Sequence, residues 1–429
     1  MPAKLLWMMV SVSLAAAACA SGAERSVRTS FENFDSRAMK GERLNVVFFG
    51  ASLTWGANAT DPQTTSYRAQ FADWLDRKYP KAHFKYFDAA IGGTGSQLGV
   101  FRFDRDVLQH KPDLVLLDFS ANDDIYSDDP EMGASYESLV RRTILDATAP
   151  VIIMIFPFQW NVTQGNTDGM KRRDMHIRIA NAYNAPYGCA ISLCIERVKS
   201  GKVTIPQIWP ADGVHPGNLG YGLFAEAAGK AFDDGLARKL TCSAPEKMLF
   251  ADTYMKNARV RISALGPLPA GWKAGVPNLT SAWYDGLMSR WLDDEVIASN
   301  LREAKTADGK TEKTFAQPGR LKLRFNGATL ILFGEETMKS GKYRTYLDGK
   351  LVEYPQGANK PPLTEIDAAG LRVGNRQHLW RVGQGLDTAV DHTLEIEPVF
   401  ADGTEQELRL ESVCVAGGKA SVVKAGGSY

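Results

Sequence analysis

The stretch that decides the fold is Leu44-Asn45-Val46-Val47-Phe48-Phe49, followed at once by Gly50-Ala51-Ser52-Leu53-Thr54. A short apolar run that ends at a glycine predicts a buried β-strand leading into a turn. The same reading places further strands at residues 84–90, 114–119 and 151–156, and a fifth in the apolar stretch near residues 190–193. Each of these segments is followed by residues with a different hydrophobic pattern.

Amphipathic segments that predict helices separate the strands. They lie at residues 65–79, 98–109, 136–147, 170–183 and 219–240. Apolar strands that alternate with helices indicate a parallel sheet covered on both faces. We therefore predict an α/β domain over residues 41–240, with its functional groups at the carboxyl ends of the strands.

From about residue 246 the pattern changes to strands separated by turns. Strands are predicted at residues 321–325, 329–333, 343–347, 393–397 and 407–415, and Asn326-Gly327 and Asp348-Gly349 are typical of hairpin turns. This pattern predicts an all-β accessory domain, a β-sandwich, over residues 246–429. The stretch 251–313, which contains Trp272, Trp283 and Trp291, is not assigned from the sequence.

The N-terminus has the layout of a secretory signal peptide. Lys4 precedes an uncharged apolar run at residues 5–20, and small residues follow as far as Ala23. The run is short for a transmembrane helix, which needs about 20 residues. We predict a signal peptide over residues 1–23 and an exported protein, periplasmic or secreted. The alternative is a lipoprotein signal in which Cys19 carries the lipid and anchors the protein to a membrane.

The composition of the 429-residue chain is that of globular domains, with 44% hydrophobic and 23% charged residues. Its net charge of +1 argues against a nucleic-acid binder and against an acidic disordered tail. Besides Cys19 there are four cysteines, which permit three pairings that the sequence does not distinguish. Buried thiols or one structural bridge are expected of them, and the oligomeric state stays open. The four are Cys189, Cys194, Cys242 and Cys414.

Four loops of the first domain carry residues suited to catalysis. They contain Ser52, the run Gly92-Gly93-Thr94-Gly95-Ser96, the run Ser120-Ala121-Asn122-Asp123 and the run Asp212-Gly213-Val214-His215-Pro216. Each run has an ordinary reading as a helix cap or a turn. Their order, and the position of three of them at strand ends, favours a single site instead.

The chemistry explains why these residue types belong together. A serine hydroxyl needs a base to become a nucleophile, and His215 is the available base because histidine as a residue type suits proton transfer near neutral pH. Asp212 can reach the other ring nitrogen and stabilise the imidazolium. The oxyanion formed from an ester requires donors placed in advance, which the N–H groups of Ser52 and Gly93 and the amide of Asn122 can supply.

At these residues the chain resembles the SGNH hydrolases, also called GDSL-type esterases and lipases. Ala51 stands where the family commonly has Asp, and Ser120 replaces the usual Gly. The resemblance covers residues 44–240 and implies a flavodoxin-like three-layer α/β/α sandwich with Ser52, Asp212 and His215 as catalytic triad. It implies no cofactor and no metal. There is no Gly-x-Ser-x-Gly elbow, which argues against the α/β-hydrolase fold.

Three other kinds of site are conceivable from the residue types present. The glycine-rich run lacks the lysine of a P-loop. The acidic residues Asp118, Asp123, Asp124, Asp128 and Asp129 could bind a cation, although turn, capping and surface roles explain them better. The remaining histidines, His83, His110, His176, His378 and His392, show no ligand spacing. A catalytically inactive glycan-binding protein is disfavoured because Ser52, Asn122, Asp212 and His215 are all present.

The substrate is inferred from the domain arrangement. An exported SGNH domain fused to a β-sandwich resembles the polysaccharide O-acetyl esterases, so an acylated carbohydrate is the expected partner. The C-terminal half contains pairs such as Tyr343-Arg344 and Trp380-Arg381, which suit sugars. The alternative substrate is a lipid, as for a lipase or lysophospholipase, which would require an apolar patch around the serine.

Overall fold

The structure is a computed structural model that describes residues 27–277, 292, 294–357, 360–369 and 375–425. The chain divides into two units, Met1–Ala251 and Asp252–Tyr429. The predicted signal peptide over residues 1–23, with Cys19, lies outside the described residues, as do Trp283 and Trp291.

The first unit is built on a five-stranded sheet with the order β2-β1-β3-β4-β5, in which every pair is parallel. The strands are β1 (Arg43–Gly50), β2 (His83–Ala90), β3 (Leu114–Leu117), β4 (Val151–Ile155) and β5 (Tyr187–Cys189). This is the flavodoxin-like order, so the predicted fold class is confirmed. The order reverses between β1 and β3, and loops that leave such a switch point form the ligand crevice of open α/β sheets.

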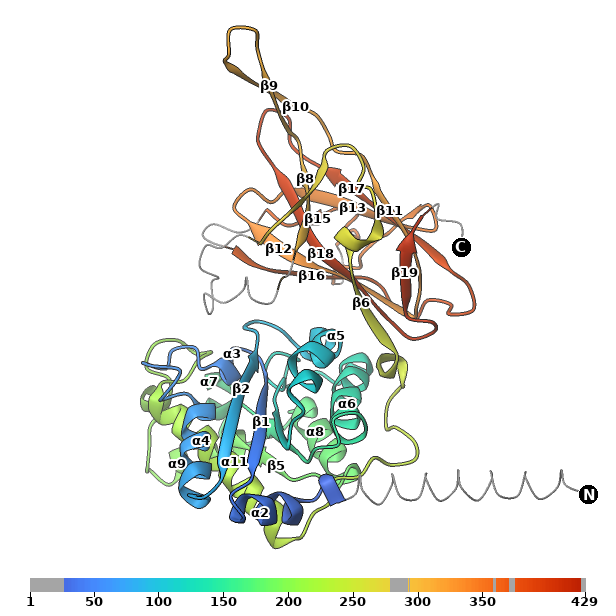
Figure 1. Ribbon diagram of the computed structural model, residues 1–429. Helices are drawn as coiled ribbons and strands as arrows, with labels where there is room; N and C mark the ends of the chain where they lie inside the picture. The colour runs from blue at the N-terminus through green and yellow to red at the C-terminus, as the bar shows by residue number, and fades with distance from the viewer. Residues whose placement is uncertain (1–26, 278–291, 293, 358–359, 370–374, 426–429) are drawn as a thin grey trace, which may run out of the picture. The chain divides into compact units, whose positions relative to one another are not determined.

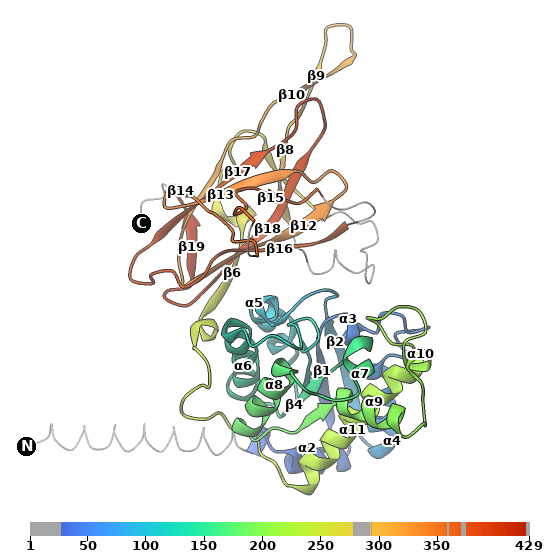
Figure 2. The same ribbon diagram turned by 180° about the vertical axis from the view of Figure 1, so that it is seen from behind.

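Helices cover both faces of the sheet. Figures 1 and 2 show α4 and α11 side by side on one face and α5 and α6 together on the other. None of the helices in the described part of the chain has the length and apolar character needed to cross a membrane. The helices are α2 (Phe31–Met39), α3 (Ser52–Trp55), α4 (Tyr67–Lys78), α5 (Ser96–Asp106), α6 (Pro130–Leu145), α7 (Gln159–Thr163), α8 (Lys171–Ala182), α9 (Ala190–Lys199), α10 (Ile205–Ile208) and α11 (Asn218–Ala237).

Local sequence signals explain where the helices begin. Ser66 precedes α4, and its side chain accepts a hydrogen bond from the amide of Ala69. Asp129 precedes α6 and accepts from the amide of Glu131, while Pro130 occupies the first helical position, where it loses no hydrogen bond. These caps satisfy amide groups that a helix leaves unpaired at its start.

One predicted strand is wrong. The apolar stretch 190–193 begins helix α9, and strand β5 is the three preceding residues, Tyr187–Cys189. Ala190, Ile191, Leu193 and Cys194 are buried, and their spacing of one, two and one residues fits one side of a helix. A short apolar run cannot by itself distinguish a strand from the first turn of a buried helix.

The second unit is a sandwich of two six-stranded sheets, which confirms the all-β prediction. One sheet contains β11 (Leu321–Asn326), β13 (Lys342–Leu347), β14 (Lys350–Leu351), β15 (Ile366–Asp367), β17 (His392–Val399) and β19 (Ser421–Lys424). The other contains β6 (Asn257–Arg261), β7 (Trp272–Gly275), β8 (Glu295–Ser299), β12 (Thr329–Thr337), β16 (Asn375–Gly383) and β18 (Glu407–Ala416). A separate hairpin joins β9 (Leu301–Lys305) to β10 (Thr311–Phe315).

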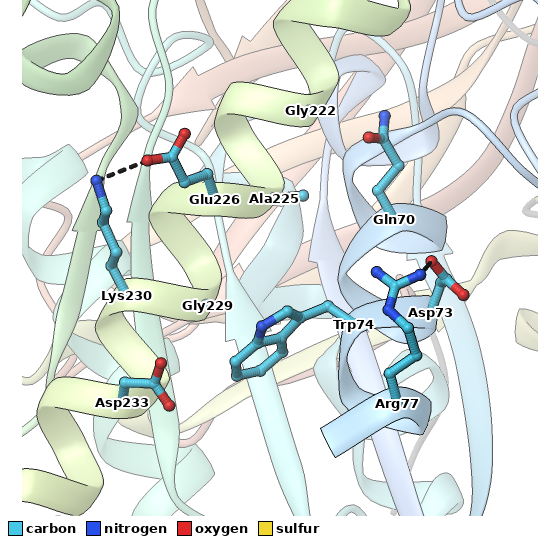
Figure 3. Close-up of a pocket in the computed structure, with 10 residues that line it drawn as sticks. All are labelled: Gln70, Asp73, Trp74, Arg77, Gly222, Ala225, Glu226, Gly229, Lys230 and Asp233. Atoms are coloured by element: carbon cyan, nitrogen blue, oxygen red, sulfur yellow. Dashed lines mark hydrogen bonds and ion pairs between the residues drawn. The ribbon is translucent and has the colours of Figure 1, made fainter. Parts of the chain in front are cut away.

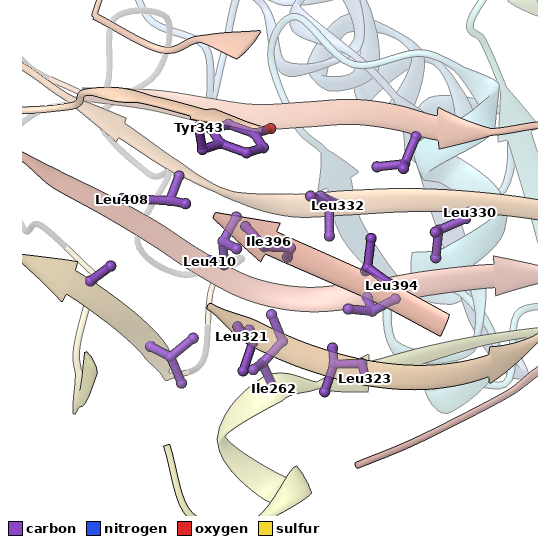
Figure 4. Packing of buried hydrophobic residues seen from close by; sticks show 14 of the residues in the cluster. Ile262, Leu321, Leu323, Leu330, Leu332, Tyr343, Leu394, Ile396, Leu408 and Leu410 are labelled. Carbon is purple, nitrogen blue, oxygen red and sulfur yellow. The ribbon is translucent and has the colours of Figure 1, made fainter. Parts of the chain in front are cut away.

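Both sheets contribute to a single apolar core. Leu323 and Ile396 come from one sheet and Leu332 and Leu410 from the other, and all four side chains are buried in the same cluster. Figure 4 shows these side chains pointing into the space between the strands. The alternating burial of β17 explains the packing, because every second side chain faces the core.

The two predicted hairpin turns have different outcomes. Asp348-Gly349 joins β13 to its antiparallel neighbour β14, with φ of 51° and 75°, so that prediction is confirmed. Asn326-Gly327 is not a hairpin turn, because β11 and β12 belong to different sheets. The Asn326 side chain is buried and donates to the carbonyls of Thr388 and Val390. This asparagine therefore links the end of β11 to the loop between β16 and β17.

Candidate active site

The structure brings Ser52 and His215 into contact, although 163 positions separate them. Ser52 is the first residue of α3, directly after β1, and His215 lies in the loop between α10 and α11. The distance from His215 Nε2 to Ser52 Oγ is 3.0 Å. That is hydrogen-bond distance for a base that takes the proton of a nucleophile. Both residues are buried: Ser52 is 4% exposed and His215 is 8% exposed.

Asp212 lies on the other side of the imidazole. Its Oδ2 is 3.4 Å from His215 Nδ1, and its Oδ1 accepts hydrogen bonds from the amides of Val214 (2.7 Å) and His215 (2.6 Å). The carboxylate is therefore held by the backbone of its own loop while it faces the ring.

Asn58 is a residue that the sequence analysis missed. Its side-chain Nδ2 donates to Asp212 Oδ2 over 2.7 Å and to the carbonyl of His215 over 3.3 Å. Partial burial acts to raise the pKa of Asp212, but the amides of His215 and Val214 and the Asn58 side chain outweigh it, so the pKa lies below its ordinary value. The negative charge next to His215 is thereby maintained.

The loop around Asn58 is also joined to the first turn of α11, which follows the histidine loop. Tyr221 donates from its hydroxyl to the carbonyl of Ala57 over 2.6 Å. Asn218 accepts from the amide of Thr60 over 3.0 Å and donates to the Thr60 hydroxyl over 2.8 Å. The only sequence signal for this pairing was the polar run that follows the serine loop, and such runs are common in turns.

The predicted oxyanion donors follow three neighbouring strands. The amide of Ser52 is at the first position of α3, where a helix leaves its N–H groups unpaired. Gly93 follows β2 with φ of 72°, a conformation that strains any residue with a Cβ. Asn122 follows β3 and is partly exposed, and its side-chain amide has no hydrogen bond to any residue that the structure describes. The topology thus places all three predicted donors at the carboxyl edge of the sheet.

Packing fixes the turn before the serine. A Cβ on Gly50 would lie 2.1 Å from Thr54 Oγ1 and 2.7 Å from the carbonyl of Asp118, so the position accepts only glycine. The buried Arg102 of α5 donates to the carbonyl of Gly50 (2.7 Å) and to that of Ala89 (2.6 Å). One guanidinium therefore holds the ends of β1 and β2 together.

Ser120, which departs from the family pattern, has a structural role. Its hydroxyl is 2.9 Å from Asp118 Oδ1 and accepts from the amide of Phe156 over 2.8 Å, so it connects the ends of β3 and β4. Burial raises the pKa of Asp118 to about 7, although hydrogen bonds from Ser120 act in the opposite direction. Burial likewise raises the pKa of Asp123 to about 6, although the amide of Ser96 acts to lower it.

The acidic residues that could bind a cation have other partners. Asp129 caps α6, Asp128 pairs with Lys171 at 2.6 Å, and Asp124 accepts from the amide of Tyr126. Within the described ranges, no three His, Cys, Asp or Glu residues are arranged to hold a metal ion.

Several histidines and cysteines outside the predicted site are buried or make other contacts. His176 is buried and stacks on Tyr136, and His378 is buried between Glu336 and Tyr343. All four described cysteines are free thiols, so no disulfide pairing occurs among Cys189, Cys194, Cys242 and Cys414 in this structure.

A groove of about 350 Å³ lies between α4 and α11, as Figure 3 shows. Trp74 forms part of the wall of this groove. The charged side chains that line the groove are paired, as in the ion pair of 2.7 Å between Lys230 and Glu226. None of the predicted site residues lines this groove.

Comparisons with known proteins give one family match and several similar solved structures. The model of the GDSL-like lipase/acylhydrolase family matches residues 48–223. A two-domain esterase active on acetylated mannans, solved alone and with mannopentaose, has a TM-score of 0.67 at 24% identity, covering 91% of this chain and 95% of its own. An acetylxylan esterase from Geobacillus stearothermophilus has a TM-score of 0.36 at 22% identity, covering 44% and 94%. No curated protein matches the sequence significantly.

The family match spans all four loops described above, from the serine to the histidine, because it begins within β1 and ends within α11. The similarity to the two-domain esterase extends the shared fold to the sandwich. The first unit of this chain therefore contains a domain, residues 48–223, that matches the GDSL-like lipase/acylhydrolase family.

Proposed function

We propose that the protein is an exported serine esterase that removes O-acetyl groups from a polysaccharide or oligosaccharide. The observation that carries the proposal is the 3.0 Å contact between Ser52 Oγ and His215 Nε2, with Asp212 on the opposite ring nitrogen. Export rests on the predicted signal peptide, with attachment through Cys19 as the alternative.

The proposed reaction proceeds through an acyl-enzyme. Ser52 Oγ attacks the ester carbonyl while His215 accepts its proton, and the amides of Ser52 and Gly93 and the side chain of Asn122 stabilise the oxyanion. The C–O bond of the ester then breaks, and the imidazolium gives its proton to the departing sugar oxygen, which leaves as a hydroxyl group. Water attacks the acyl-enzyme with His215 again as base, which releases acetate and restores the serine. Asp212 stabilises the imidazolium in both halves.

The two-domain architecture supports a carbohydrate ester as substrate. The solved structure with both domains is that of an esterase active on acetylated mannans, and one of its crystals contains mannopentaose. A polymer substrate gives the second unit a role, because binding energy from sugars remote from the ester can orient the acyl group.

A lipid ester is the second candidate, because the family description includes lipases. The two candidates differ in what they require around Ser52. An acetyl group needs little space, whereas a long acyl chain needs an extended apolar surface.

The test compares substrates and variants in the full chain. Wild type should hydrolyse acetylated oligosaccharides and 4-nitrophenyl acetate, and it should prefer acetyl to octanoyl esters. Ser52→Ala should abolish both activities, whereas Ser200→Ala, an exposed serine at the end of α9, should leave them unchanged. Near-normal turnover by Ser52→Ala would refute the mechanism, and a preference for octanoyl esters would refute the substrate.

A further inference from the structure

Exposed aromatic side chains are rare in the first unit. Among its described residues only three large aromatic side chains count as exposed: Trp160 at 48%, Tyr187 at 38% and Tyr126 at 37%. Tyr187 begins β5 and so lies at the amino edge of the sheet. Trp160 and Tyr126 instead follow β4 and β3, at the carboxyl edge where the candidate site lies.

Trp160 lies against the loop that carries Asp212 and His215. A methyl group placed on Gly213 would be 3.8 Å from the indole ring, and the amide of Gln159 donates to the Gly213 carbonyl over 2.8 Å. The ring of Phe158 lies 4.7 Å from that of Trp160, at an angle of 42°. The indole is thus supported from two sides while about half of its surface faces solvent.

The other end of the short helix α7 is joined to the loop that carries Asn122. Gln164, which ends α7, accepts a hydrogen bond from the Tyr126 hydroxyl over 2.8 Å. Tyr126 lies four positions after Asn122 in the same loop. The helix that carries Trp160 therefore connects the loop of the proposed base to the loop of a proposed oxyanion donor.

We propose that Trp160 determines specificity by stacking its indole on a sugar ring of the acylated saccharide, beside the ester that Ser52 attacks. This inference rests on the proposed function, since it names the part of the site that receives the sugar. The face of an aromatic ring carries partial negative charge, and it attracts the polarised C–H groups on one face of a pyranose. The indole N–H, for which the described residues provide no hydrogen-bond acceptor, is available to a sugar hydroxyl.

Two other roles for Trp160 make different predictions. If the indole merely supports Gly213, its loss would disturb Asp212 and His215 and would slow every ester equally. If it receives an acyl chain, its loss would affect octanoyl esters most. A sugar platform alone predicts a defect confined to saccharide esters.

The experiment uses the full chain with Trp160→Ala, Trp160→Phe and the matched control Tyr187→Ala. The substrates are chemically O-acetylated cello-, xylo- and manno-oligosaccharides, 4-nitrophenyl acetate and 4-nitrophenyl octanoate. Trp160→Ala should raise KM for the best saccharide about tenfold, the factor that corresponds to losing one aromatic contact. It should leave kcat and the hydrolysis of 4-nitrophenyl acetate nearly unchanged. Trp160→Phe should recover most of the loss, and Tyr187→Ala should match wild type.

An equal loss on 4-nitrophenyl acetate, a greater loss on the octanoyl ester, or an unchanged KM would each overturn the inference. Calorimetric titration of the same oligosaccharides into Ser52→Ala, with and without Trp160→Ala, separates it from the proposed function. Suppose that wild type hydrolyses no saccharide ester but that oligosaccharide binding weakens without Trp160. That result would support the stacking role of Trp160 and refute the proposal that the protein is a carbohydrate esterase. Binding that does not depend on Trp160 would overturn the platform alone.

Discussion

Replacing Asn58 tests whether the candidate triad depends on a group outside it. Asn58 has φ of 68°, so glycine is the substitution that removes the side chain without straining the backbone. Asn58→Gly deletes the 2.7 Å bond to Asp212 Oδ2 and leaves the two amide bonds to Oδ1. The carboxylate would remain in place but would be free to turn away from His215.

The size of the effect follows from the exposure of the carboxylate. A hydrogen bond to a charged group is worth about 1.5–3 kcal/mol. The side chain of Asp212 is 45% exposed, so water replaces part of the loss and about 1 kcal/mol remains. That corresponds to roughly a fivefold fall in kcat near neutral pH.

The pH dependence provides an independent check. Asn58 is one of the groups that lower the pKa of Asp212, so its removal should raise that pKa. A lowered carboxyl pKa stabilises the folded state above the ordinary pKa, and this contribution is lost as pH falls through the lowered value. In Asn58→Gly both the stability and the activity attributed to Asp212 should therefore be lost at a higher pH than in wild type.

The assay is kcat for 4-nitrophenyl acetate between pH 4 and 9, with thermal unfolding at each pH. Asn184→Gly is the matched control, because Asn184 also has positive φ, at 49°, and its side chain donates to the carbonyl of Thr241, away from the predicted site residues. Equal kcat values for the two variants across the whole range would refute the positioning role of Asn58.

Four further outcomes are expected. Asn122→Ala should lower kcat about 100- to 1000-fold with little change in KM, as steady-state kinetics on an acetyl ester would show, whereas a change in KM alone would mean that Asn122 only positions substrate. The pKa of Asp118 is raised from 3.8 to about 7, so the folded state binds a proton that the unfolded chain lacks in that range and stability falls as pH rises. Asp118→Asn should flatten this part of the melting temperature profile, and an unchanged slope would contradict the assignment. Chelators should leave esterase activity intact. A loss of activity that divalent cations restore would instead indicate that the acidic residues around Asp123 bind a cation. Truncation after Ala251 should lower kcat/KM for acetylated polymers but not for 4-nitrophenyl acetate in a fragment that circular dichroism shows to be folded, and an equal loss on both would make the second unit structural.

The choice of Ala251 for that truncation comes from the structure. The amides of Leu249 and Phe250 donate to the buried carboxylate of Glu137, at 2.7 and 2.8 Å. Cleavage near Leu240, the predicted end of the first domain, would leave this buried charge with fewer partners, which destabilises a fold. Sequence patterns gave no sign of the contact because it joins an ordinary linker to a helix 112 positions earlier.

Strands with long apolar runs were predictable because burial on both faces leaves a simple pattern. Two predictions were wrong for different reasons. The apolar run at residues 190–193 fits both a strand and the first turn of a buried helix. The turn signal at Asn326 marks a residue whose side chain holds another loop. Strands β9 and β10 are hard to predict because they form an isolated hairpin whose residues are largely exposed and therefore lack alternation.

The candidate site was predictable only to the extent that chemistry dictates residue type. Ser52, Asp212 and His215 carry groups that a reaction needs, and the structure brings them together. Asn58 and Arg102 act on other residues rather than on substrate, and no chemical pattern distinguishes them from ordinary loop and helix residues. Their roles depend on tertiary distances, which a single sequence does not contain.

The four unpaired thiols affect how the protein can be handled. Because no described cysteine needs a partner, the reducing cytoplasm of an expression host should not prevent folding. Cys194, Cys242 and Cys414 are buried, and burial raises the pKa of each thiol, to about 12 for Cys242 and Cys414, so all three should resist alkylation. Cys189 is the partly accessible thiol among these four, which makes it a natural position for a single fluorescent or spin label on the native fold.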